Sequence, residues 1–111
     1  MADRIHRVTM FKIPSAGDRD KLLEQYQILQ QNSKRDGRPY ILSLVVGAAE
    51  ADARAQGFTL VSKSEFASMD DMRYYDEQCP AHAALKAFAG AELAVDGVLT
   101  VYFRPHLVVG S

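Results

Sequence analysis

The sequence lacks the features that mark several classes of protein. A single cysteine, Cys79, excludes an internal disulfide framework and suits a reducing compartment. Thirteen basic residues against 14 acidic ones give a net charge of -1, so no basic footprint for nucleic acid is present. No apolar run approaches the roughly 20 residues of a membrane span, and no secretory signal is visible. We therefore expect a cytoplasmic protein with neither a nucleic-acid partner nor a membrane association.

Length and composition are those of a small globular protein. A chain of 111 residues is expected to form one domain, residues 1–111. Its hydrophobic fraction of 48% and charged fraction of 24% are ordinary for a soluble fold. Folding at this size buries roughly two-thirds of the surface of the unfolded chain, which is enough for one modest core.

Four segments favour β-strands because β-branched and aromatic residues are frequent in them. The expected strands span residues 5–13, 40–46, 58–66 and 98–103. In the first strand His6, Val8 and Met10 share one face, and Ile5, Arg7, Thr9, Phe11 and Ile13 share the other. No strand offers a wholly polar face, so both faces of the sheet are expected to be covered.

Two helical regions separate these strands. Leu22, Tyr26 and Leu29 recur at helical spacing and predict a helix over residues 18–33. Ser68, followed three residues later by an acid, begins a second helix over residues 69–77. Pro80 ends that helix, because proline disfavours helix at the residue before it, and begins a third helix.

The third helix is expected to run to about residue 88, with a further turn over residues 91–95. A short helical turn is expected within the loop of residues 47–56. The order βαββαβ predicts an α+β, ferredoxin-like unit, in which a four-stranded antiparallel sheet carries its helices on one face. The opposite face would be apolar, so we expect a homodimer packed sheet to sheet about a two-fold axis.

Several motifs together resemble one family. They are the strand that carries His6, the segment GFTLVSKSEFASMDDMRYYDEQCPAHAALKAF and the closing DGVLTVYF. With these motifs the chain resembles the stress-responsive dimeric α/β-barrel (Dabb) family, from about Arg4 to Phe103. The resemblance implies a ferredoxin-like unit that dimerises through its sheets into a barrel.

The resemblance also implies site residues. Plant polyketide cyclases of this family close a linear polyketide by aldol condensation with a histidine and a tyrosine that correspond to His82 and Tyr75. Their ligand contacts correspond to His6 and Tyr26, and a pocket histidine of those enzymes falls on Leu60. One extra residue separates Tyr75 from the Pro-Ala-His segment, so their substrate does not transfer. We also expect Leu22 among the substrate-binding residues.

The chemistry of this pair needs no metal and no organic cofactor. A neutral histidine is suited to remove a proton beside a carbonyl, and a phenol can orient it or donate to the developing enolate oxygen. The loop of residues 14–18 holds no dense carboxylate cluster, so no metal site is predicted. We predict a cofactor-independent polyketide cyclase or lyase that binds a small apolar β-dicarbonyl compound in a barrel pocket.

Two alternatives remain open. The first is a non-catalytic stress-response dimer that binds small apolar ligands or has a purely structural role. In that case His82 only completes a hydrogen bond near a helix start. The second is a heme- or quinone-linked monooxygenase, for which the sequence shows no distinctive set of residues.

Overall fold

The expected order of elements is confirmed in the computed structural model, which describes residues 4–110. The elements are β1 (Ile5–Lys12), α1 (Ala16–Asn32), β2 (Ile41–Ala48), the 3₁₀ turn η1 (Ala53–Ala55), β3 (Leu60–Phe66), α2 (Met69–Glu77), α3 (Pro80–Glu92) and β4 (Gly97–Phe103). Within residues 4–110, no helix is both long and apolar enough to cross a membrane. The fold is the predicted ferredoxin-like α+β unit.

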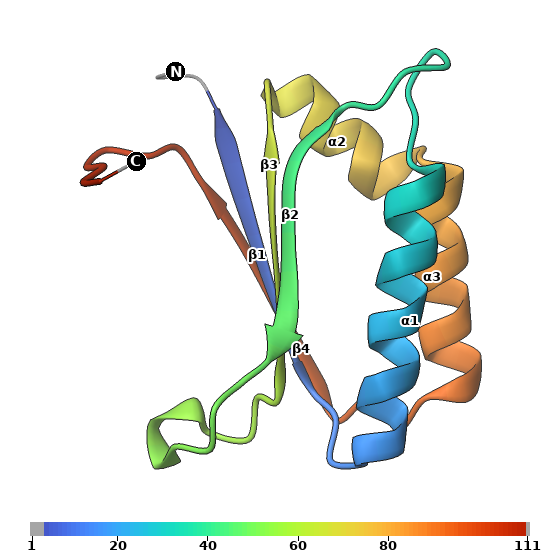
Figure 1. Ribbon diagram of the computed structural model, residues 1–111, viewed down its shortest axis with the longest axis vertical. Coiled ribbons are helices and arrows are strands. Elements are labelled where there is room, and N and C mark those ends of the chain that lie inside the picture. Colours follow the sequence, from blue (N-terminus) through green and yellow to red (C-terminus); the bar gives the residue numbers. More distant parts are fainter. Residues whose placement is uncertain (1–3, 111) are drawn as a thin grey trace.

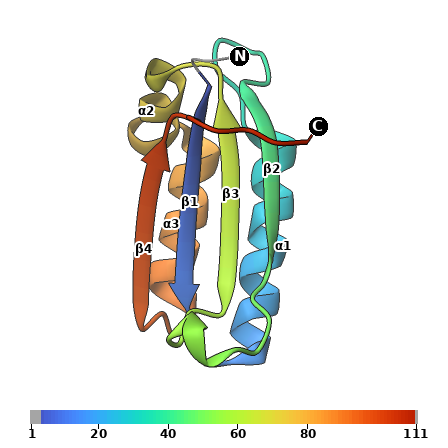
Figure 2. The same cartoon turned by 90° about the vertical axis from the view of Figure 1, so that its left-hand side faces the viewer.

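The strands form one antiparallel sheet in the order β2-β3-β1-β4. β1 is central, as its apolar residues on both faces predicted, and β2 and β4 are the edges. The helices cover one face of this sheet (Figure 1). The other face, seen directly in Figure 2, is open except where the segment after β4 crosses in front of its upper part. We call these the inner and the outer face.

Element boundaries differ from the prediction where local contacts decide them. α1 begins two residues earlier, because the Ser15 hydroxyl accepts a hydrogen bond from the Asp18 amide at 3.2 Å and caps the helix. β3 begins at Leu60 rather than residue 58, after a turn in which Gln56 and Gly57 have positive φ angles. α3 continues without interruption to Glu92.

The core lies between the inner face and the helices. β1 and β3 alternate buried and half-buried residues, as the two-residue period of a strand requires. Ile5 and Phe66 from the sheet and Leu29 from α1 are almost completely buried there. The inner face also carries buried polar side chains, which are Arg7, Thr9, Ser62 and Ser64. This polar strip within an apolar layer marks where a site can form.

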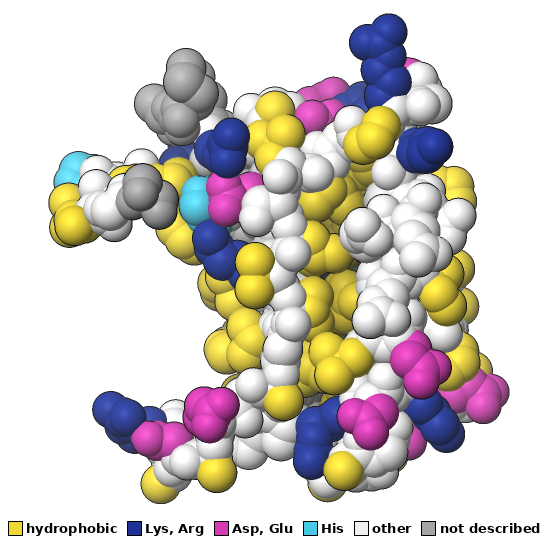
Figure 3. All heavy atoms as spheres, viewed as in Figure 1, with side chains coloured by type: hydrophobic (Ala, Val, Ile, Leu, Met, Phe, Trp, Pro, Cys, Tyr) yellow, Lys and Arg dark blue, Asp and Glu magenta, His cyan; other side chains and the backbone are white. Residues whose placement is uncertain are grey.

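The outer face is uncovered and largely apolar, as the sequence predicted, apart from a charged cluster around Glu65 at one end. Val45 on β2 and Leu99, Val101 and Phe103 on β4 are each 44–63% exposed. In Figure 3 hydrophobic atoms line much of the concave side of the sheet, opposite the helices, and charged groups lie at its upper end. Contiguous apolar surface of this kind is typical of protein–protein interfaces.

Candidate functional site

A cavity of about 420 Å³ lies between α3 and the β1–β4 side of the inner face. In Figure 2 α3 runs behind these two strands. The lining residues are Arg7, Thr9, Phe11, Tyr26, His82, Leu85, Lys86, Ala89, Gly90, Leu93, Val95, Val98 and Thr100. Ligand sites have this size and this character, mostly apolar with a few converging polar groups.

The break between α2 and α3 places His82 against Tyr75. Seven residues of continuous helix would separate the two positions by about 10 Å along the axis. Because α2 ends at Glu77 and α3 begins at Pro80, the chain turns back and the two rings stack instead. Their centroids are 3.8 Å apart and their planes differ by 14°. The Cys-Pro break therefore creates the contact.

His82 is held as a neutral base. Its Nδ1 lies 2.8 Å from the backbone carbonyl oxygen of Tyr75. A carbonyl can only accept, so Nδ1 carries the proton and Nε2 keeps a lone pair. Burial, together with the positive charges of Arg7 and Lys86, lowers the pKa of His82 to about 4. The hydrogen bond to Tyr75 acts in the opposite direction and raises the pKa, but it is the weaker influence. At neutral pH the imidazole can therefore accept a proton at Nε2.

Tyr75 supports His82 from beneath and is 1% exposed. Its contact with the imidazole is ring on ring, and no hydrogen bond among the described residues joins its hydroxyl to the histidine. Burial raises the pKa of Tyr75, so its hydroxyl remains a donor throughout the accessible pH range. Tyr26 lines the cavity, and burial raises the pKa of its hydroxyl too.

Leu22 and Leu60, two further predicted binding residues, lie in the core. Each is completely buried, and neither belongs to the cavity wall. Leu22 packs from α1 and Leu60 from the first position of β3. They support the layer behind the cavity rather than border it.

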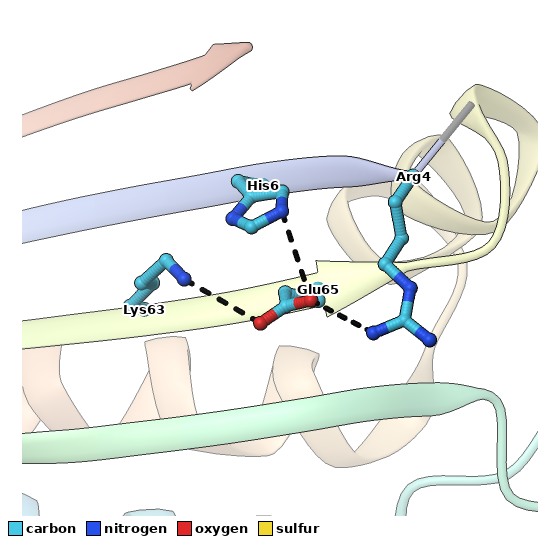
Figure 4. Close-up of polar contacts among 4 residues, drawn as sticks. All are labelled: Arg4, His6, Lys63 and Glu65. Carbon is cyan, nitrogen blue, oxygen red and sulfur yellow. Dashed lines mark hydrogen bonds and ion pairs between the residues drawn. The ribbon is translucent and has the colours of Figure 1, made fainter. Parts of the chain in front are cut away.

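His6 lies on the outer face, opposite the cavity. β1 alternates its side chains, so a residue adjacent to Arg7 must point to the other side of the sheet. Figure 4 shows His6 beside Glu65, which also pairs with Arg4 and Lys63. His6 Nε2 is 3.6 Å from the Glu65 carboxylate, and its ring lies 5.2 Å from that of Phe103. His6 and the Tyr75–His82 pair are thus on separate faces.

Arg7 is the prominent cavity residue that the sequence did not single out. It is 8% exposed, and its guanidinium lies 2.8 Å from the Asp76 carboxylate and 5.1 Å from the Tyr75 ring centroid. It also donates to the Thr9 hydroxyl at 2.9 Å. The available signal was an arginine in the middle of the otherwise apolar face shared by Ile5, Thr9, Phe11 and Ile13.

The described part of the chain holds no group of three or more histidine, cysteine, aspartate or glutamate residues that could bind a metal ion. The polar groups at the cavity wall are instead one imidazole, two cations, and the hydroxyls of threonine and tyrosine. Such a set can take up a proton and bind oxygen atoms of a ligand.

Sequence comparisons agree with this architecture. Residues 5–100 match the family model of the stress responsive A/B barrel domain, Dabb. A Fusaristatin A biosynthesis cluster protein from Gibberella zeae is 50% identical over 111 residues, which are 100% of this chain and 80% of that protein.

Solved structures share the fold. A hydroxynitrile lyase from Passiflora edulis has a TM-score of 0.75 and 18% identity, over 99% of this chain and 100% of its own. A dimeric ferredoxin-like protein of unknown function from Jannaschia sp. CCS1 has a TM-score of 0.74 and 16% identity, over 92% and 99%. A cofactor-independent oxygenase from Streptomyces nogalater has a TM-score of 0.70 and 12% identity, over 99% and 100%. At these identities the likeness shows the fold alone.

Proposed function

Because the chain belongs to the stress responsive A/B barrel (Dabb) family, we propose that it is a cofactor-independent enzyme of the cyclase or lyase kind. It removes a proton beside a carbonyl of a small, largely apolar β-dicarbonyl compound bound in the cavity. The observation that carries this proposal is the state of His82, which lines the cavity as a neutral imidazole whose Nε2 has no hydrogen-bond partner among the described residues. An imidazole in this state is neutral at pH 7 and can accept a proton at Nε2 without a metal, although its lowered pKa makes it a weaker base than a free histidine.

The residues around His82 fit the roles that such a reaction requires. Nε2 takes the proton, while the Tyr75 carbonyl fixes the tautomer and the Tyr75 ring fixes the plane of the imidazole. Tyr26 lines the cavity and keeps a protonated hydroxyl that can donate to the oxygen on which negative charge develops. The carbanion formed then attacks a second carbonyl in a cyclase or expels a leaving group in a lyase.

The names of related proteins support an enzyme over a purely structural dimer. The 50% identical relative is named for a biosynthesis cluster, and proteins of the same fold are named as a lyase and as a cofactor-independent oxygenase. Fold alone does not transfer an activity. The proposal therefore stands on the cavity and its histidine, with these names as support.

The test is exchange of the α-hydrogens of methyl 3-oxooctanoate in D2O, followed by proton NMR at pH 6. The protein is expected to accelerate exchange above the buffer rate, and His82→Gln is expected to lose about 10²- to 10⁴-fold of that acceleration. His106→Gln, which changes an exposed histidine in the segment after β4, is the matched control and is expected to exchange at the wild-type rate.

Two results would contradict the proposal. Undiminished exchange by His82→Gln would show that another group is the base. Exchange at the buffer rate by the wild-type protein, with the ester bound, would favour the alternative of a non-catalytic dimer that holds small apolar ligands.

The uncovered outer face supports a further part of the proposal, a homodimer packed through the two outer faces. Val45, Leu99, Val101 and Phe103 would become buried in it, which removes apolar surface from water. Two proteins of this fold, from Jannaschia sp. CCS1 and Thermobifida fusca, are named as dimeric. Light scattering is expected to give twice the mass of one chain, and the mass of one chain at every concentration would contradict the dimer.

A further inference from the structure

The charges on the cavity wall are all of one sign. Arg7 from β1 and Lys86 from α3 line the cavity, and no carboxylate is among the residues that do. His82 is neutral, so it does not add a charge near pH 7. A mostly apolar cavity of low dielectric strengthens the field of such cations. Asp76 offsets the charge of Arg7 from outside the cavity wall, but Lys86 leaves the wall with a net positive charge, which favours a ligand that carries negative charge.

Arg7 has hydrogen-bonding capacity that the protein does not use. One Nη2 hydrogen faces Asp76 at 2.8 Å, and Nη1 donates to Thr9 at 2.9 Å. A guanidinium carries five N–H groups, and among the described residues Nε has no partner although it is buried. One further N–H remains on each terminal nitrogen. Nε has almost no accessible surface, so an acceptor supplied by a ligand would have to meet the unused N–H groups of the terminal nitrogens.

Two threonines continue this polar strip toward the mouth of the cavity. The hydroxyls of Thr9 and Thr100 lie 3.0 Å apart. Only one of their two hydroxyl hydrogens can be used in that contact, so the other remains free to donate. Thr100 is the exposed member and lines the cavity. An oxygen atom of a ligand would thus meet donors from Arg7 and from this hydroxyl pair.

The remaining wall is apolar and suits the body of the same ligand. Phe11, Leu85, Leu93 and Val98 contribute to it. We propose that the cavity binds a small amphiphilic carboxylate, with the carboxylate on Arg7 and Thr100 and the apolar body along α3. This inference rests on the proposed function and narrows its substrate class from β-dicarbonyl compounds in general to those with a free acid group.

A purely structural role for Arg7 makes a different prediction. Its ion pair with Asp76 and its position over Tyr75 tie the end of α2 to β1. If these contacts were the only role of Arg7, its substitution would change the stability of the protein. The preference between a charged and an uncharged ligand would stay the same. The ratio of two affinities therefore separates the two roles.

The experiment compares 4-phenylbutanoate with 4-phenylbutanamide, which have the same shape and differ in charge. Their dissociation constants are measured at pH 7 by titration of proton–nitrogen correlation spectra. The wild-type protein is expected to bind the carboxylate roughly 10- to 100-fold more tightly, the range for hydrogen bonds to a charged group. Arg7→Gln is expected to abolish this preference, and Arg7→Lys to keep part of it.

Control variants separate charge recognition from folding and from shape. Arg7→Gln combined with Asp76→Asn removes both charges of the ion pair, so this double variant replaces the single variant if Arg7→Gln fails to fold.

A Cβ at Gly90 meets no atom within 4 Å, so the side chain introduced by Gly90→Leu can extend into the cavity. Gly90→Leu is expected to weaken the binding of both probes by the same factor. Asp76→Asn alone frees Arg7 from its partner and is expected to increase the preference for the carboxylate.

Three results would overturn the inference. They are equal binding of the two probes by the wild-type protein, an unchanged preference in Arg7→Gln, and no binding of either probe at millimolar concentration. These outcomes are independent of the exchange test. If exchange by His82 is found without a carboxylate preference, only the present inference fails. A preference without exchange leaves an anion-binding cavity and removes the proposed reaction.

Discussion

His6 and Arg7 are adjacent in the chain, yet β1 places them in opposite environments. Arg7 enters the cavity side of the sheet and is 8% exposed, with Asp76 and Thr9 as its contacts. His6 belongs to the uncovered outer face, where its neighbours are Glu65 and Phe103 (Figure 4). The comparison shows that face, and not residue type, decides which polar side chain can meet a small ligand.

The two histidines make the same point. His82 stacks on Tyr75, and burial, followed by the positive charges of Arg7 and Lys86, disfavours its protonation. His6 has a carboxylate at 3.6 Å instead. Burial and like charges nearby disfavour the charged form of a histidine such as His82. His82 is therefore neutral at neutral pH, with Nε2 unbonded among the described residues, and His6 lies beside charged side chains on the outer face.

The largest effect is expected from a substitution that disrupts the outer face and leaves the inner face unchanged. Val101→Lys would place an unpaired charge within the proposed dimer interface. Burying a charge without a partner costs about 3 kcal/mol or more, which weakens the dimer by over roughly a hundredfold. Light scattering is expected to give single chains with an unchanged circular dichroism spectrum. Ile28→Lys, on the exposed side of α1, is the control and should remain dimeric.

An effect of intermediate size is expected on the inner face, where His82 makes the stability of the protein depend on pH. The pKa of His82 falls from 6.5 to about 4 on folding, so the unfolded chain binds more protons between these values. The associated stability is complete above about pH 6.5 and is lost as the pH falls toward 4. Between pH 7.5 and 4.5 the wild-type protein should lose about 2 to 3 kcal/mol more than His82→Gln, at 1.36 kcal/mol per pKa unit.

Urea unfolding of both proteins at the two pH values, at one protein concentration, measures this difference. Equal losses would show that His82 is not held neutral by the fold. The same pair of proteins in the exchange assay links the stability effect to the proposed chemistry, because catalysed exchange should decline as the pH falls through about 4.

The smallest effect belongs to the outer face. Arg4, above all, lowers the pKa of Glu65, with further contributions from His6 and Lys63. A lowered pKa contributes stability above the ordinary value of 4.5, and this is lost as the pH falls through the folded value. Glu65→Gln should therefore cost less than about 1 kcal/mol at pH 7, as is usual for ion pairs near the surface. A larger loss in urea unfolding would show that this cluster carries stability comparable to the core.

The fold could be predicted from the sequence because its signals are local. Alternation in residues 5–13, helical spacing of Leu22, Tyr26 and Leu29, and the Cys-Pro break each determine one element. Their order leaves few topologies, since helices must cover one face of the sheet. Boundaries were less predictable, because they depend on single contacts such as the Ser15 cap of α1.

The site was less accessible to sequence reasoning. Periodicity separates the two faces of β1 but does not say which of them meets the helices, so neither the outward position of His6 nor the inward one of Arg7 follows from it. Tyr75 and His82 could be expected to approach across the break. Their stacking, and the bond from Nδ1 to a backbone carbonyl, depend on the angle between α2 and α3. Three-dimensional packing sets that angle.

The edge position of β4 bears on how the newly made chain avoids aggregation. Gly97–Phe103 is seven residues long, uncharged and rich in β-branched and aromatic side chains, and it is paired on one side only. Segments of this composition at a sheet edge recruit further strands and lead to aggregation. Arg104 and Pro105, which follow directly, are residues that interrupt such growth. A strand that lines the cavity is thus also one whose free edge needs protection while the chain is newly made.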